Sequence, residues 1–162
     1  LEGYGPGEVL RRVNDCIRQD AASPLLLSAF YTVLDADSGR LTYANAGHNA
    51  PILLRAATGQ LELLESHGLL LGAFPTFIPN EHASTLEPGD FVVFFTDGIT
   101  EARSADGGFM DDEGLEAIVR SRRWSSATEL LTAIVDGVDA FAAGVAQADD
   151  FTIVVLHRLP PT

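Results

Sequence analysis

The sequence predicts an α+β domain of mostly antiparallel strands, with helices packed on the faces of the sheets. Short apolar or alternating segments, separated by turn residues, recur through the first two thirds of the chain and are typical of antiparallel strands. Amphipathic helical periodicity occurs at the start and near the end. The 162 residues are 46% apolar and 20% charged, which is a globular composition. We therefore expect one domain over residues 1–162.

The first predicted element is an amphipathic helix from Glu8 to about Asp20. Its apolar residues recur at three- and four-residue steps, and Pro6 suits the first helical turn. Cys16 lies on the predicted apolar face. We therefore expect Cys16 to be a small core residue and not a nucleophile.

Strands follow, each bounded by turn residues. The first two are joined by the turn Asp35–Gly39, which predicts a hairpin. The run Phe91–Phe95 is continuously apolar, which indicates a strand covered on both faces. The predicted strands are Leu25–Leu34, Arg40–Ala44, Pro51–Arg55, Gln60–Leu64, Phe77–Leu86, Phe91–Phe95 and Phe151–His157.

Two helices are predicted in the last third. Asp111 or Asp112 can cap the first, which reaches about Ser121. Ser126 and Glu129 have capping-box spacing for the second, which continues through Phe141 and ends near Gly144.

Composition excludes several classes of protein. The net charge of −13 argues against nucleic acid or an anionic membrane as partner. No apolar run is long enough for a membrane helix, and no signal peptide is visible at the start. A single cysteine cannot form an internal disulfide. Together these observations predict a cytoplasmic protein without membrane insertion.

The most suggestive candidate site is Thr96-Asp97-Gly98, directly after the apolar strand. A carboxylate at the end of such a strand is held rigidly, and it needs a cation, a charged side chain or hydrogen-bond donors as partner. Asp97 could equally cap a helix over Ile99–Ala102, where Glu101 would favour the positive helix end. Both interpretations are open.

Asp149 and Asp150 precede the last strand. Carboxylates are ligands that Mg²⁺ and Mn²⁺ prefer, although a turn after a helix also explains this pair. The metal interpretation becomes stronger if Asp97 and Asp149 end on neighbouring strands at the same sheet edge.

A third candidate is the corner Asn45–Pro51, from which His48 projects. His48 could be an acid, a phosphate contact or a ligand, or could hydrogen-bond locally. The other histidines lack the spacing of a metal trio. Ser28 and Ser66 lack the Gly-x-Ser-x-Gly context of a serine hydrolase.

These motifs, taken in order, resemble a known family. The chain is similar to the metal-dependent (type 2C-like) protein serine/threonine phosphatases, in the bacterial branch of stage II sporulation protein E and RsbU. The resemblance covers roughly residues 6–158. It is carried by Phe30–Val33, Asp37–His48, Gly68–Gly72, Leu86–Asp90, Phe94–Arg103 and Asp149–Val155.

The resemblance implies an α-β-β-α sandwich with a two-metal Mn²⁺ or Mg²⁺ centre, where a metal-activated water attacks a phosphoserine or phosphothreonine. It implies that Asp97 and Asp149 are catalytic metal ligands and that Asp150 also serves the metals. Supporting or substrate-contacting roles are implied for Gly98, Asn45, His48 and Glu101. The implied substrate is a phosphorylated anti-sigma-factor antagonist, so that dephosphorylation releases a sigma factor.

The sequence also departs from the family. The Gly-Asp-(aromatic)-(aromatic)-Asp motif and the later Gly-Asp-Val motif of the N-terminal half do not occur here. We therefore expect the C-terminal portion of a phosphatase domain, with an incomplete metal centre and no activity of its own. We also expect uncovered apolar surface and a homodimer. The alternative is a non-catalytic, phosphatase-like module that binds a regulatory protein.

Overall fold

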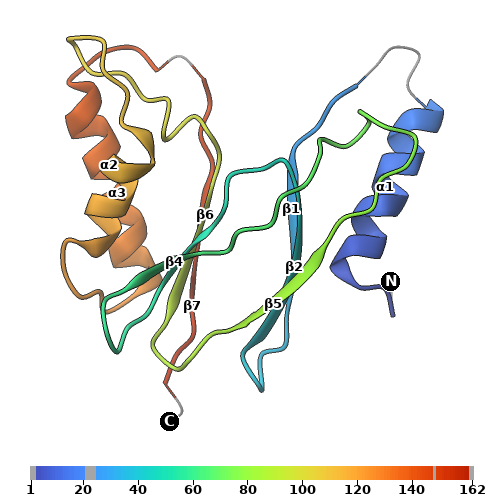
Figure 1. The fold of residues 1–162 in the computed structure, drawn as a ribbon. Coiled ribbons are helices and arrows are strands. Elements are labelled where there is room, and N and C mark those ends of the chain that lie inside the picture. Colours follow the sequence, from blue (N-terminus) through green and yellow to red (C-terminus); the bar gives the residue numbers. More distant parts are fainter. Residues whose placement is uncertain (1–2, 21–24, 148, 161–162) are drawn as a thin grey trace. The chain divides into compact units, whose positions relative to one another are not determined.

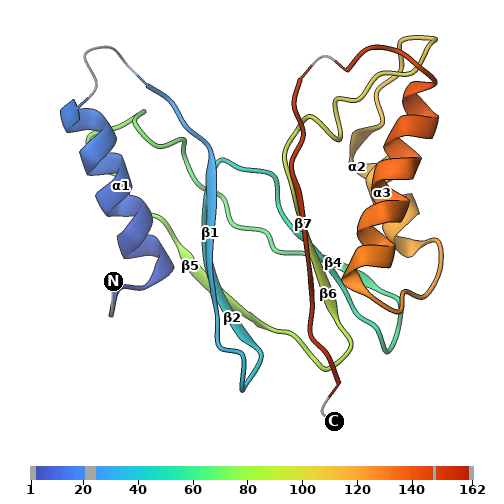
Figure 2. The same cartoon turned by 180° about the vertical axis from the view of Figure 1, so that it is seen from behind.

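The computed structural model describes residues 3–20, 25–147 and 149–160. Contacts within the chain define two compact units. The first comprises Leu1–Ala50 and Leu64–Leu86, and the second comprises Pro51–Leu63 and Glu87–Thr162. Each unit contains one antiparallel sheet with helical cover (Figures 1 and 2). The predicted α+β class with mostly antiparallel strands is confirmed.

The first unit is built on a sheet with the order β1-β2-β5. The predicted hairpin is confirmed, because β1 and β2 pair antiparallel with Phe30 opposite Asn45. In its turn, Gly39 has a φ of 75° and its N–H donates to the Asp35 carbonyl. The elements of this unit are α1 (Pro6–Asp20), β1 (Ala29–Leu34), β2 (Arg40–Ala46) and β5 (Glu81–Thr85).

Helix α1 packs on this sheet through Leu10 and Ile17 (Figure 1). The predicted apolar face of the helix is partly wrong, because Cys16 is exposed whereas Asn14 is fully buried. The Asn14 amide donates to the Phe74 carbonyl and accepts from the Gly72 N–H. These bonds to a neighbouring loop satisfy a buried polar side chain, which periodicity alone cannot anticipate.

The second unit is built on a sheet with the order β4-β3-β6-β7. Helices α2 and α3 lie beside each other over this sheet (Figures 1 and 2). Leu115 and Val119 of α2, and Leu130 and Ile134 of α3, are fully buried in its core. The elements of this unit are β3 (Ile52–Leu54), β4 (Leu61–Leu63), β6 (Phe91–Phe95), α2 (Asp111–Arg120), α3 (Ala127–Ala142) and β7 (Ile153–His157).

Strand β6 has the predicted bounds. Val92 and Val93 point to opposite faces, and both are fully buried. The strand is therefore covered on both faces, as its continuous apolar run predicts.

Helix α3 is capped at the predicted residue, Ser126, whereas α2 begins at Asp111 after Met110, which makes no side-chain cap. Asp111 has a φ of 56° and its carboxylate accepts from the Gly114 N–H. Ser126 accepts from the Glu129 N–H, while the Glu129 carboxylate accepts from Ser125 and not from Ser126. In a capping box, the Glu129 carboxylate would accept the N–H of the cap residue Ser126. Here it accepts the N–H of the preceding residue, Ser125.

Strands β3, β4 and β7 are each two residues shorter than predicted, β2 is two residues longer, and β1 and β5 are shorter by four and five residues. Residues 25–28 contribute only an isolated bridge between Leu27 and Leu71. The segment before Glu81 is not a strand, and Pro79 within it has no N–H for a ladder. Among the described residues, no helix has the length and apolar character needed to cross a bilayer.

Candidate active site

The C-terminal end of β6 and the N-terminal end of β7 meet at one edge of the second sheet. The two strands are antiparallel, with Phe95 opposite Ile153. Pairing continues beyond the strands, because the Thr96 N–H donates to the Thr152 carbonyl at 3.1 Å. The Thr152 N–H in turn donates to Thr96 Oγ1 at 2.9 Å. The two predicted carboxylate segments therefore leave the sheet side by side.

Gly98 lies directly against the second of these segments. A Cβ built on Gly98 would come within 2.6 Å of the Asp150 carbonyl oxygen and 3.2 Å of the Phe151 Cβ. Only glycine permits this approach without a shift of the backbone. Asp97 follows β6 and Asp149 precedes β7, and these neighbouring strands meet at the same sheet edge. The condition that strengthens the metal interpretation is therefore met.

Asp97 does not cap a helix. Residues 97–101 form turns, in which the Glu101 N–H donates to the Asp97 carbonyl at 2.8 Å. The Thr100 hydroxyl donates to the same carbonyl at 3.1 Å. Within the described part of the chain, the exposed Asp97 carboxylate accepts no hydrogen bond. The capping interpretation is wrong, and the carboxylate is left available to a ligand.

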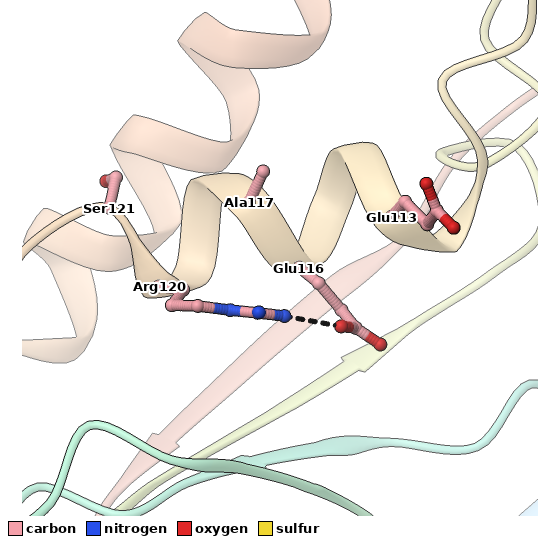
Figure 3. A pocket seen from close by; sticks show the side chains of 5 residues that line it. All are labelled: Glu113, Glu116, Ala117, Arg120 and Ser121. Atoms are coloured by element: carbon pink, nitrogen blue, oxygen red, sulfur yellow. Dashed lines mark hydrogen bonds and ion pairs between the residues drawn. The ribbon is translucent and has the colours of Figure 1, made fainter.

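The remaining acidic candidates of this unit are also exposed. The Asp149 carboxylate accepts the Asp150 N–H at 2.8 Å. Glu101 lines an open hollow with Asp111 and Asp112. Beside α2, a second hollow is lined by Glu113 and by Glu116, which is paired with Arg120 at 2.6 Å (Figure 3). Both hollows are open to solvent, and their charged side chains are of the kind found on ordinary protein surfaces. Neither hollow by itself indicates a binding site.

The donor atoms at the sheet edge are oxygens of the kind that Mg²⁺ and Mn²⁺ prefer. Their number is too small. In the ranges 3–20, 25–147 and 149–160, no three His, Cys, Asp or Glu side chains gather as a metal site. The described residues therefore fit part of a metal centre and do not form one by themselves.

Asn45 and His48 belong to the first unit. The Asn45 amide accepts from the His48 N–H and donates to the His48 carbonyl, both at 2.8 Å. His48 Nδ1 lies 3.0 Å from the Ser28 hydroxyl. Gly68 packs onto the Asn45 carbonyl so closely that a Cβ there would lie at 1.9 Å. Asn45 thus makes local hydrogen bonds that hold the corner at His48.

The same corner forms one side of a pocket of about 380 Å³, lined also by Glu65, Ser66 and His67. The buried Ser66 hydroxyl has no hydrogen-bond partner among the described residues. No motif in the sequence points to a role for Ser66 or His67 in a pocket. Gly47 and Gly68, which let the two loops approach, are the signal that could have found them.

Solved structures with the same fold are phosphatase domains. The chain superimposes on the SiaA-PP2C domain of Pseudomonas aeruginosa with a TM-score of 0.83, at 17% identity, over 94% of this chain and 61% of that one. It superimposes on the manganese-soaked phosphatase domain of SpoIIE from Bacillus subtilis with a TM-score of 0.71, at 16% identity, over 99% and 69% of the two chains. These likenesses establish the fold.

The family follows from the sequence. The model of stage II sporulation protein E (SpoIIE) matches residues 1–159. The chain is also 31% identical over 156 residues to the phosphoserine phosphatase RsbU of Bacillus subtilis. The chain belongs to the SpoIIE family of phosphatases. It spans 46% of the length of that curated relative.

Proposed function

We propose that this chain is part of a protein phosphatase domain that hydrolyses phosphoserine or phosphothreonine with Mn²⁺ or Mg²⁺. Asp97 and Asp149 are its candidate catalytic ligands, and Asp150 serves the same metals. When bound, the metals would supply an activated water and stabilise the phosphoryl oxygens. Membership in a family of phosphatases supports the reaction class.

One observation carries the site assignment. The contact of Gly98 with the Asp150 backbone holds two exposed carboxylate segments together at one sheet edge. These segments come from positions more than fifty residues apart, and Asp97 caps no helix. Exposed, adjacent carboxylates repel one another unless a cation lies between them.

The proposed substrate is a phosphorylated regulatory protein of the anti-sigma-factor antagonist type, acting in the cytoplasm. The similarity to a phosphoserine phosphatase supports phosphoserine as the target. The net charge of −13 supports a protein partner over nucleic acid.

The proposed metal centre needs ligands in addition to those described. Two carboxylate segments leave most coordination positions of two hard cations to water, which predicts weak binding. We therefore propose that the 162 residues alone are inactive and that turnover requires further metal ligands from outside this sequence.

The test uses the longest natural reading frame that contains this sequence. The protein encoded by that reading frame should release phosphate from a phosphoserine peptide in the presence of Mn²⁺ and should not do so when EDTA removes the metal. Asp97→Asn should lower turnover by at least roughly 100-fold, since even residues that only support a metal ligand cost 10- to 100-fold. Asp112→Asn, an exposed carboxylate of the same unit, is the matched control. Equal activity of Asp97→Asn and Asp112→Asn would refute the site.

A second candidate function is a non-catalytic module that binds a regulatory protein. The observation in its favour is that no three potential metal ligands meet in the described ranges. The same reading frame distinguishes the two functions. A module would bind a phosphorylated partner with a measurable Kd but would release no phosphate at any Mn²⁺ concentration.

We further propose that the chain forms a homodimer through a leucine surface of the first unit. The bridge between Leu27 and Leu71 places two leucine-rich segments side by side. The surface comprises the exposed side chains of Leu25, Leu26, Leu27, Leu69 and Leu70. Contiguous apolar side chains of this kind mark interaction sites on many proteins.

A further inference from the structure

A small pocket lies at the end of β6 that is opposite to Asp97. It is formed within the second unit by the start of β6, the turn between β3 and β4, and the loop between α2 and α3. Its volume is about 130 Å³. Strand β6 has five residues, so roughly 17 Å of strand separate this pocket from the candidate active site.

The floor of the pocket is apolar and rigid. Leu54 and Phe91 are buried at 5% and 2% exposure, and the half-buried Trp124 forms a wall. The Trp124 indole N–H donates to the Val119 carbonyl at 2.8 Å, which fixes the ring. The Phe91 ring is stacked on His157 at 4.0 Å. These contacts form the pocket before any ligand binds.

Of the described residues, three arginines and no carboxylate line the pocket itself. Arg55 is bound to Glu62 and Asp90 of its own chain. Arg122 is paired with Glu129 at 2.9 Å and lies 4.4 Å above the Trp124 ring. These partners hold the two guanidiniums in place around the opening.

Arg123 differs from its neighbours. Its one hydrogen bond in the described part of the chain goes to the Ala56 carbonyl, at 3.4 Å. It is exposed and forms no ion pair there, whereas the nearby Arg120 is paired with Glu116 (Figure 3). Among the described residues, Arg123 therefore places a cation without a carboxylate partner beside an apolar pocket.

Size and charge together define the occupant. Pockets for small molecules span roughly 300–1,000 Å³, so this one is too small for a nucleotide or a similar ligand. It has room for one apolar side chain. The arginines around the opening favour carboxylates next to that side chain. Tryptophan and arginine are also among the residues that contribute most to binding at protein interfaces.

We propose that this pocket binds an acidic segment of a partner protein, which inserts one leucine- or phenylalanine-sized side chain between Trp124 and Phe91 and pairs a flanking carboxylate with Arg123. The site is a docking surface and does not depend on the proposed phosphatase activity. A partner bound in this pocket would leave the sheet edge that carries Asp97 and Asp149 uncovered.

Trp124 is the only tryptophan of the chain, so its fluorescence reports on this pocket alone. The probe is an acetylated and amidated peptide, Asp-Asp-Leu-Glu-Glu, titrated into the 162-residue chain at low salt. We expect a saturable change in Trp124 emission that weakens as salt is added. A peptide with alanine in place of leucine, and one with lysine in place of every acid, should bind at least roughly tenfold more weakly.

Arg123→Glu should weaken peptide binding by roughly tenfold or more, because a charge-assisted hydrogen bond is replaced by repulsion. Arg123 is exposed, so the variant should fold normally, which circular dichroism checks. Arg40→Glu, with the same charge change at an exposed position of the first unit, should bind like the unaltered chain.

Five results would overturn the proposal. The first four are no emission change with the leucine peptide, equal binding of the alanine peptide, an equal loss in Arg40→Glu, and an emission shift on increasing protein concentration without peptide. The last would show that a second copy of the chain fills the pocket. A larger response to phosphatidylserine vesicles than to the peptide would also refute it.

Discussion

Gly98 lies against the backbone of Asp150, with space for a hydrogen atom but not for a methyl group. A Cβ on Gly98 would meet the Asp150 carbonyl oxygen at 2.6 Å. Because this atom belongs to the backbone, it cannot turn aside as a flexible side chain can. The spacing of the two carboxylate segments therefore depends on a residue without a side chain.

Gly98→Ala should destabilise the fold by roughly 1–3 kcal/mol, the range for forcing an extra methyl into a packed site. Urea unfolding followed by circular dichroism measures the change. Gly108→Ala is the control, since its Cβ would meet only side-chain atoms, the Ser104 hydroxyl oxygen at 3.2 Å and an Asp106 carboxylate oxygen at 3.8 Å. If both variants unfold at the same urea concentration, Gly98 does not hold the sheet edge together.

Asp90 anchors the turn before β6. It is buried at 2% exposure, pairs with Arg55 at 2.8 Å and accepts the N–H groups of Ala56 and Glu87. Asp90→Ala should cost about 3 kcal/mol, because it leaves these donors unpaired. Asp112→Ala, at an exposed position, should change the free energy of unfolding by less than about 0.5 kcal/mol. Similar losses in the two variants would contradict this role.

Stability should depend on pH through Glu8. Hydrogen bonds from Arg11 and Arg12 lower the pKa of Glu8 from 4.5 to about 2. A carboxyl with a depressed folded-state pKa stabilises the fold above its unfolded pKa, and this contribution is lost as pH falls through the folded pKa. The thermal midpoint should therefore fall between pH 4.5 and about 2.

Glu8→Gln cannot titrate, so its thermal midpoint should fall less over the same pH range. The difference should shrink at high salt, because these ion pairs are exposed. Calorimetric scans of both chains across the range provide the comparison. Parallel curves for the two chains would show that Glu8 contributes nothing to the acid response.

The leucine surface should mediate self-association. Leu26→Glu places a charge in its middle and should convert a dimer to a monomer in light scattering at high protein concentration. Leu159→Glu is the matched control, since Leu159 is 71% exposed and lies in the second unit. A monomer in the unaltered chain would remove the dimer proposal altogether.

Several elements could be predicted because their signals are local. The apolar run Phe91–Phe95 forms a strand with those bounds. Ser126 caps helix α3, as its spacing from Glu129 predicts. Both depend on residues within a few positions of one another. The hairpin through Gly39 is of the same kind.

Other features depend on contacts between distant segments. Nothing near Asn14 indicates that it is buried and Cys16 exposed, because its partners are some sixty residues away at Gly72 and Phe74. The position of Asp97 beside Asp149 likewise depends on the pairing of Phe95 with Ile153, which lie more than fifty residues apart in the sequence.

Composition, turn residues and ordered motifs were enough to establish the α+β class, the family resemblance and the candidates Asp97, Asp149 and Asp150. These depend on residue identity and short-range spacing, which a sequence displays directly. Tertiary structure alone decided that Asp97 and Asp149 share a sheet edge, and that Trp124, Phe91 and three arginines enclose a pocket. The reason is physical: strand pairing and loop packing join residues far apart along the chain, and their free energies depend on the whole fold.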